Sequence, residues 1–136
     1  MQIKITSGAY AFDALLLTAE APKTCAIFLA ALPLTDRIIH VRWSGEACWI
    51  PFGEKDFGLA YENATSFPAP GDVLFYPGGF SETELLIGYG AVRFASKMGQ
   101  LAGNHFMTIT SDKHLLAEFG RKTLWDGAQP ITFSVG

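Results

Sequence analysis

The segment 62–90 constrains the fold more than any other part of the sequence. Residues 73–76 and 84–87 form short apolar runs, and the Pro-Gly-Gly at 77–79 between them has the composition of a tight corner. This rhythm of short strands and turns is typical of a small closed β-structure. Eighteen residues of the segment hold three acids and two tyrosines: Asp72, Glu82, Glu84, Tyr76 and Tyr89. We therefore expect it to form one wall of any ligand site.

The composition favours one domain built mainly of strands. The chain has 136 residues, of which 49% are hydrophobic, and its mean hydropathy is +0.23. This is enough for a core without disulfides. Fourteen glycines and eleven phenylalanines favour strands joined by tight turns. We expect a single domain over residues 1–136.

Charge and hydropathy argue against several classes of partner. The net charge is −3 and there is no basic run, so nucleic acid is not an expected partner. No apolar run reaches the roughly 18 residues of a membrane span. There is no signal-peptide pattern, so the expected location is cytoplasmic. Cys25 and Cys48 are expected to be buried thiols in such a protein.

Hydrophobic periodicity predicts about eight short strands and two helices. Residues 1–6 and 11–20 have the pattern of an N-terminal hairpin. Pro22 suits the first turn of a helix that ends before Pro33. Further strands are expected at 38–41, 47–52, 73–76, 84–87 and 105–109, with an exposed excursion at 54–61 and either strand or loop at 91–96.

The C-terminal quarter predicts a second helix and a closing strand. Ser111 is expected as its N-cap, with Asp112 in the first turn. Gly120 is expected to weaken this helix or end it early. Residues 131–135 are predicted to form a final strand that pairs with the first. These elements together predict a closed barrel of about eight strands with two helices.

Four stretches resemble a known superfamily. Residues 21–32, Ala-Pro-Lys-Thr-Cys-Ala-Ile-Phe-Leu-Ala-Ala-Leu, resemble the first-helix motif of cyclophilins, with Ile27 where Asn is usual. The chain is more similar to small bacterial and archaeal cyclophilin-like proteins, which carry a Trp-Gly-Glu type turn and a Tyr/Trp-Pro-Gly-Gly corner. The matching stretches here are Arg42-Trp-Ser-Gly-Glu46, Gly71-Asp72 and Tyr76-Pro-Gly-Gly79. The resemblance covers nearly the whole chain and implies a closed cyclophilin-like barrel.

The prolyl isomerase motif of cyclophilins is not matched. Those enzymes carry Phe-His-Arg followed by Phe-x-x-Gln-Gly-Gly-Asp. Here Arg37 and Arg42 lie outside such a motif, and Gln-Gly-Gly-Asp is absent. We therefore expect weak or no prolyl isomerase activity, and no isomerase role is carried over to any residue.

Six residues are candidates for lining a ligand site: Arg42, Glu46, Trp49, Tyr76, Glu82 and His105. Arg42 would hold an anionic group, the two glutamates would orient donors, and the aromatic rings would exclude water. Each has a structural alternative. Arg42 and Glu46 can form an ion pair across a turn, Tyr76 can serve a tight corner, and His105 can be a hydrogen-bonded structural residue.

Other chemical motifs are weak or missing. Glu82 and Glu84 share a side if their segment is extended, where two carboxylates can split their pKa values or bind a cation; otherwise they mark a solvated strand end. The three histidines lack metal-site spacing, no serine lies in a nucleophile elbow, and no phosphate loop is present. No metal or cofactor is expected.

Three functions stay open at this point. The leading one is a small-molecule-binding barrel that, if it is an enzyme, acts on a small carboxylate or amide. The first alternative is a weak or vestigial prolyl isomerase. The second is an assembly module without a ligand, in which exposed Phe52, Phe57 and Phe67 are buried between subunits. A homo-oligomer is compatible with all three.

Overall fold

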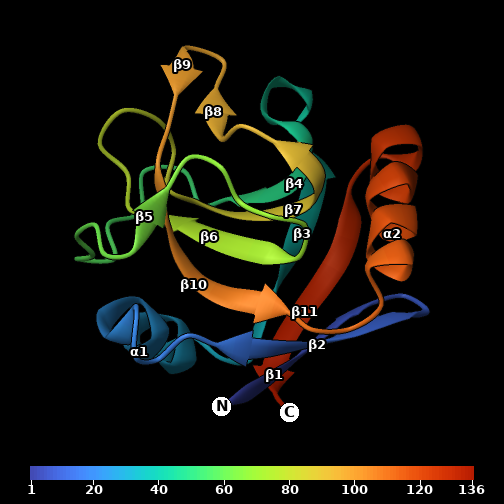
Figure 1. Cartoon of the computed structure of the whole chain (residues 1–136), viewed down its shortest axis with the longest axis horizontal. Helices are drawn as coiled ribbons and strands as arrows, with labels where there is room; N and C mark the ends of the chain where they lie inside the picture. The colour runs from blue at the N-terminus through green and yellow to red at the C-terminus, as the bar shows by residue number, and fades with distance from the viewer.

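The computed structural model describes all residues from 1 to 136 as a small barrel with two α-helices (Figure 1). In chain order the elements are β1 (Gln2–Ser7), β2 (Tyr10–Leu16), α1 (Pro22–Ala30), β3 (Leu34–His40), the 3₁₀ helix η1 (Arg42–Ser44), β4 (Gly45–Pro51), β5 (Ala64–Thr65), β6 (Asp72–Tyr76), β7 (Glu84–Val92), β8 (Ala95–Ser96), β9 (Gly99–Gln100), β10 (Gly103–Ile109), α2 (Lys113–Asp126) and β11 (Gln129–Val135).

Eight antiparallel strands close on themselves. The order is β2-β1-β11-β3-β4-β7-β6-β10, and β10 pairs back to β2, while the two-residue strand β5 adds to the side of β10. The hairpin of β1 and β2 and the pairing of β1 with β11 follow the sequence prediction. The predicted fold class, a mainly β closed barrel of about eight strands with two helices, is confirmed.

The barrel interior holds the main core of 23 buried apolar residues. Period-two alternation places one face of every strand inside, and the two helices pack against this core from opposite sides of the molecule (Figure 1). Phe28 of α1 meets the rings of Phe106 and Phe133 edge to face, with centroids 5.1 and 5.6 Å away. Leu116 and Phe119 are the corresponding buried residues of α2.

A second, smaller cluster lies on the outer face of β4, β6 and β7. Its eight members are Val41, Ala47, Trp49, Leu74, Tyr76, Leu86, Phe94 and Leu101. Cys48 and Ile50 on either side of Trp49 belong to the interior core, so Trp49 faces outward. Phe94 and Leu101 come from the segment around β8 and β9, which covers this outer face. The cluster is what buries the side chains of the site described below.

Helix α2 differs from the prediction at its start and in its length. Asp112, not Ser111, is the N-cap: its Oδ1 accepts a hydrogen bond from the His114 N–H at 2.8 Å. The Ser111 hydroxyl instead accepts from the Asp13 N–H at 2.7 Å, which ties the loop to β2. The helix also continues through Gly120 to Asp126, because this glycine packs directly on the ring of Tyr89.

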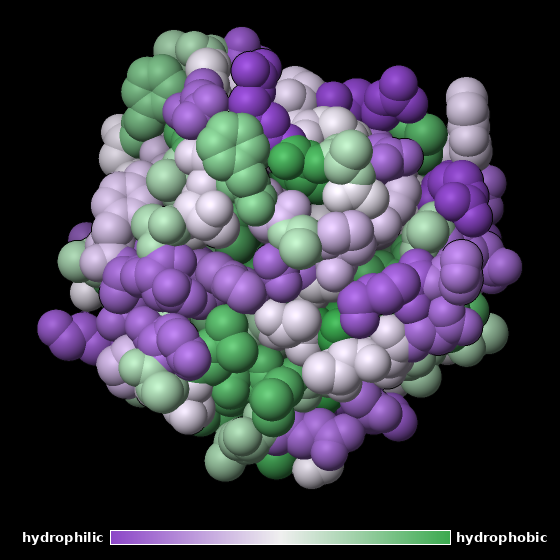
Figure 2. Space-filling view, viewed as in Figure 1, coloured by the Kyte–Doolittle hydropathy of each residue, from purple (hydrophilic) through white to green (hydrophobic).

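The surface is mixed in character. In the view of Figure 2 polar residues cover most of the face, and apolar side chains gather in smaller groups among them. The exposed large apolar side chains include Trp125 at 81% and Phe67 at 66%. Neither α-helix has the length and hydropathy that crossing a membrane requires. Both cysteines are buried free thiols, as predicted.

Candidate functional site

A small hollow beside the outer cluster gathers the most unusual polar groups of the chain. We call it the tryptophan–glutamate hollow. Its volume is about 100 Å³, and it is lined by Trp43, Trp49, Ser81, Glu82, Glu84, Ser96 and Lys97. Four separate segments supply these residues: η1, β4, the loop before β7 with the first residue of β7, and the hairpin of β8 and β9.

Strand register brings its walls together. Trp49 lies opposite Leu86, and Glu84 lies opposite Pro51 on one side and Tyr76 on the other. Trp49 and Glu84 are therefore diagonal neighbours on the outer face of the barrel. Trp43, half exposed on η1, meets Trp49 edge to face with ring centroids 6.1 Å apart. The result is an apolar wall next to a carboxyl group.

The Glu84 side chain is buried without a partner. The residue is only 2% exposed, and burial, followed by the negative charge of Glu82, raises its pKa to about 9. Its carboxyl group is therefore protonated at neutral pH. It makes no hydrogen bond within the protein, and its oxygens are not fully enclosed, so an O–H donor and a carbonyl acceptor are available to the hollow that Glu84 lines.

Trp49 contributes a second unsatisfied group. The side chain is 8% exposed, and its indole Nε1 is fully buried with no hydrogen-bond partner. Buried polar groups are nearly always paired in folded proteins, and the other unpaired one here is His40 Nδ1, away from this hollow. An unpaired indole N–H beside the unbonded Glu84 carboxyl favours this hollow as a ligand site. Sequence alternation had suggested that Glu82 and Glu84 share a side; in the structure both line this hollow, Glu82 exposed and Glu84 buried.

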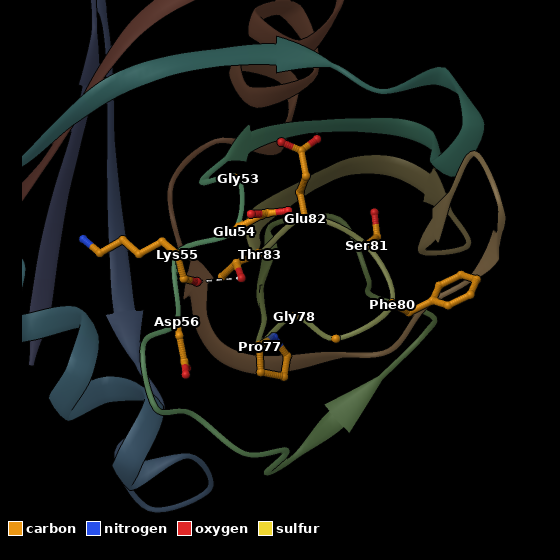
Figure 3. Close-up of a pocket in the computed structure, with 11 residues that line it drawn as sticks. Gly53, Glu54, Lys55, Asp56, Pro77, Gly78, Phe80, Ser81, Glu82 and Thr83 are labelled. Carbon is orange, nitrogen blue, oxygen red and sulfur yellow. Dashed lines mark hydrogen bonds between the residues drawn. The ribbon is translucent and has the colours of Figure 1, made fainter.

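A larger cavity adjoins the hollow. This corner cavity has a volume of about 560 Å³ and lies between residues 53–56 and residues 77–83 (Figure 3). Ser81 and Glu82 line both spaces. Tyr76 shapes the corner from beneath, because its hydroxyl accepts hydrogen bonds from the N–H groups of Phe80 and Ser81 at 3.0 and 3.1 Å. The Thr83 hydroxyl donates to the Lys55 carbonyl at 2.9 Å and joins the two walls (Figure 3).

A separate hollow lies between η1 and the second half of α2. We call it the arginine hollow. Its volume is about 310 Å³, and its lining residues are Arg42, Gly45, Glu46, Tyr89, Arg121, Leu124 and Trp125. Arg42 and Glu46 form no ion pair within 4.0 Å. Glu46 Oε1 instead accepts a hydrogen bond from the Ala91 N–H at 2.8 Å.

The sequence matches a protein family over nearly its whole length. Residues 3–135 match the family described as "Protein of unknown function (DUF3830)". The chain belongs to this family. No curated protein matches this DUF3830 chain at a significant level.

Two solved structures share the fold of this DUF3830 barrel. McbB, solved in complex with tryptophan, has a TM-score of 0.72 and 17% identity over 98% of the chain. The chain spans 44% of the length of McbB. The hypothetical protein AF2241 from Archaeoglobus fulgidus has a TM-score of 0.63 and 14% identity, with 100% of this chain and 95% of that one covered. At these identities the likeness shows the fold alone.

The six residues proposed from the sequence of this DUF3830 protein fall in four places. Trp49 and Glu82 line the tryptophan–glutamate hollow, and Arg42 and Glu46 line the arginine hollow. Tyr76 lies beneath the corner. His105 lies apart on β10, where its Nε2 is 2.8 Å from the Thr108 hydroxyl and 3.1 Å from Asp72 Oδ1. Whether any of them binds a ligand stays a prediction.

Two lining residues that carry a charge or a large ring had no role in the sequence analysis: Arg121 and Trp125. Both lie on α2, about 80 residues from Arg42 along the chain, and no local motif links them to it. No group of three or more histidine, cysteine or acidic side chains is arranged to hold a metal ion. The protonated Glu84 carboxyl beside the tryptophan wall can exchange hydrogen bonds or a proton with a molecule in the hollow.

Proposed function

We propose that this protein binds a small molecule that carries a carboxamide or similar neutral group, which enters the tryptophan–glutamate hollow. The observation that carries the proposal is the Glu84 carboxyl, buried, protonated at neutral pH and without a partner. The body of the ligand lies over Ser81 and Glu82 and occupies the corner cavity.

The chemistry of a neutral carboxyl selects this class of ligand. A protonated carboxyl presents a donor and an acceptor side by side, and a carboxamide presents the same pair in reverse. A bound carboxamide then makes two hydrogen bonds to the Glu84 carboxyl, which has no partner in the unliganded protein. An apolar group cannot make these bonds. A carboxylate is a poorer fit, because it would lie next to Glu82 and Glu84, and the cation that lines the hollow, Lys97, is solvent-exposed.

The volumes of the two spaces indicate which part of the ligand each one holds. The tryptophan–glutamate hollow, at about 100 Å³, is smaller than the roughly 300–1,000 Å³ of a complete small-molecule site. The corner cavity, at about 560 Å³, falls inside that range. A ligand of this shape has a compact amide group held between Trp43, Trp49 and Glu84, and a larger polar body outside.

The comparisons support a ligand-binding role at a coarse level. McbB shares the barrel and has been solved with tryptophan, a small molecule with an amino acid head group and an aromatic ring. The first-helix motif and the barrel of eight strands with two helices support the relationship to cyclophilin-like proteins. A cytoplasmic location, a single-domain organisation and a homo-oligomeric state belong to the same proposal.

Paired probes test the proposal. Benzamide and benzoate differ by one group, and ¹H–¹⁵N spectra of the protein report on the indole N–H of each tryptophan. We expect benzamide to shift the Trp49 and Trp43 indole signals and benzoate to bind more weakly. Glu84→Gln keeps a donor and an acceptor and should retain binding, whereas Glu84→Leu should weaken it by about tenfold or more, the value of one or two buried hydrogen bonds.

Glu20→Gln is the matched control, since Glu20 is exposed and lines neither the tryptophan–glutamate hollow nor the corner cavity. Equal affinity for the amide and the acid, or full binding by a folded Glu84→Leu protein, would overturn the proposal. Before any probe is added, native mass spectrometry of the purified protein shows whether it retains a ligand and how many subunits it has.

A further inference from the structure

Two arginines in the arginine hollow have no acidic partner. Arg42 comes from η1 and Arg121 from α2, and both are exposed. The ion pairs of the chain within 4.0 Å are His105 with Asp72 and Lys122 with Asp126, so neither guanidinium is neutralised by a carboxylate. Asp126, the acid at the end of α2, is held by Lys122 at 2.8 Å.

We infer that the arginine hollow is a second binding site, which takes a small aromatic carboxylate. A guanidinium matches a carboxylate with two parallel hydrogen bonds, and two of them face the same space of about 310 Å³. Trp125 and Leu124 supply an apolar wall, and the Trp125 side chain is 81% exposed in the unliganded protein. An aromatic ring attached to the carboxylate covers this indole.

The base of the hollow is pre-organised. The Tyr89 hydroxyl is 2.7 Å from His40 Nε2, and the two rings meet edge to face with centroids 5.5 Å apart. Burial, followed by Cys48 and Glu46, raises the pKa of the Tyr89 hydroxyl, and the charges of Arg42 and Arg121 offset part of this rise. The contact with His40 fixes the Tyr89 side chain, which lines the hollow together with both arginines.

Glu46 limits the charge of the anion that the arginine hollow can bind. Its carboxylate is fixed by the Ala91 N–H and lines the same hollow. Two positive charges and one negative charge leave an excess of one, which suits a singly charged carboxylate better than a doubly charged phosphate. The site is independent of the tryptophan–glutamate hollow, since the two share no lining residue.

The experiment uses the intrinsic tryptophans as separate reporters. The chain has three, and Trp125 lines only the arginine hollow while Trp43 and Trp49 line the other. ¹H–¹⁵N spectra are recorded during titration with 3-phenylpropionate, with the neutral 3-phenylpropionamide and with inorganic phosphate. Assignment of the Trp125 indole signal comes from a Trp125→Phe variant.

We expect 3-phenylpropionate to shift the Trp125 signal and to bind at least about tenfold more tightly than the amide, the value of a charge-assisted hydrogen bond. Arg42→Gln and Arg121→Gln should each weaken binding by about tenfold or more. Arg37→Gln removes the same charge from an exposed arginine outside the hollow and should leave the affinity unchanged. Added salt should weaken binding.

Three results would overturn the inference. The first is a Trp125 signal that does not move on addition of the acid. The second is an amide that binds as tightly as the acid, and the third is an Arg37→Gln variant that weakens binding as much as Arg42→Gln and Arg121→Gln. Phosphate binding as tight as that of the acid overturns the selectivity for an aromatic carboxylate. Benzamide shifts at Trp49 are recorded on the same sample, so failure of one site is distinguished from failure of the other.

Discussion

Glu84 links the chemistry of the candidate site to the stability of the barrel. Its pKa is 4.5 in a solvated chain and about 9 in the folded protein, so folding above pH 4.5 takes up a proton at this residue. The group stabilises the fold fully below pH 4.5, and this contribution is lost as the pH rises toward 9. Burial next to Glu82 is thus retained at an energetic cost near neutral pH.

The pH dependence of unfolding measures this effect. Each unit between the two pKa values changes the free energy of unfolding by up to about 1.4 kcal/mol, so the fold should lose up to about 2.7 kcal/mol from pH 6 to pH 8. Glu84→Gln removes the titration. We expect its melting temperature to lie several degrees above that of the parent at pH 8 and the gap to shrink toward pH 5. A gap that does not change with pH would show that Glu84 is ionised in the fold.

Gly120 is fixed by the ring of Tyr89. A Cβ at this position would overlap the Tyr89 ring, which also forms the base of the arginine hollow. Gly120→Ala should gain up to about 1 kcal/mol of helix propensity and lose about 1–3 kcal/mol to overpacking. We expect a lower melting temperature and a displaced His40–Tyr89 hydrogen bond. Adding Tyr89→Leu should recover the helix gain; a Gly120→Ala protein more stable than the parent would contradict this packing.

The environment of single residues in the candidate site is only partly predictable from the sequence. Alternation placed Glu82 and Glu84 on one side on the condition that their segment is extended, and both line the same hollow. The burial of Glu84 does not follow from alternation, because it depends on the hairpin of β8 and β9, which covers the outer face from elsewhere in the chain. The one sequence signal was an acid that directly precedes the apolar run 85–87.

At the scale of elements, Asn104 of β10 fastens a loop and a helix to the barrel. The residue is fully buried. Its Nδ2 donates to the Thr24 hydroxyl and the Ala60 carbonyl at 3.1 and 3.0 Å, and its Oδ1 accepts from the Glu62 N–H at 3.0 Å. The Thr24 hydroxyl in turn donates to Glu62 Oε1 at 2.7 Å. This network joins β10, α1 and the segment before β5.

Asn104→Ala should therefore destabilise the fold more than the loss of an ordinary exposed amide side chain does. Three buried hydrogen bonds are lost together, and we expect the free energy of unfolding to fall by about 2–4 kcal/mol. Hydrogen exchange should accelerate first at Glu62 and at the start of α1. Gln100→Ala, which removes an exposed amide, serves as the control and should change stability by less than about 0.5 kcal/mol. Equal effects of the two variants would show that the network contributes nothing.

Helices and strands were predicted correctly where local sequence patterns are strong. The predictions were wrong where contacts between residues distant in the sequence determine the structure. The hairpin, the first helix and the closing strand follow from alternation, a proline and helical spacing. Helix α2 was expected to weaken or end at Gly120, because helix propensity disfavours glycine. In the fold the helix continues through this position, where the Tyr89 ring packs against it. The same packing brings Arg121 and Trp125 to Arg42, which no pattern in the sequence indicates.

At the scale of the whole molecule, the barrel type leaves the function open and the side chains narrow it. Arg42 lies on a 3₁₀ helix among the residues of the arginine hollow, and the chain lacks the isomerase motif. We expect the rate of proline isomerisation in a standard peptide assay to stay at background, and Arg42→Ala to leave it there with a melting temperature within a few degrees of the parent. A robust rate abolished by Arg42→Ala would make the protein an isomerase instead.

Closure of the barrel also limits how a partner can dock. Seven of its eight pairings link neighbours in the strand order, and the pairing of β10 with β2 closes the ring. The backbone edge that stays open is short: β3 pairs with β4 only at Ile39 and His40, so Leu34–Ile38 has no strand on that side. Side chains and cavities therefore offer most of the surface for recognition, and specificity can change by substitution at a few lining positions while the backbone stays as it is.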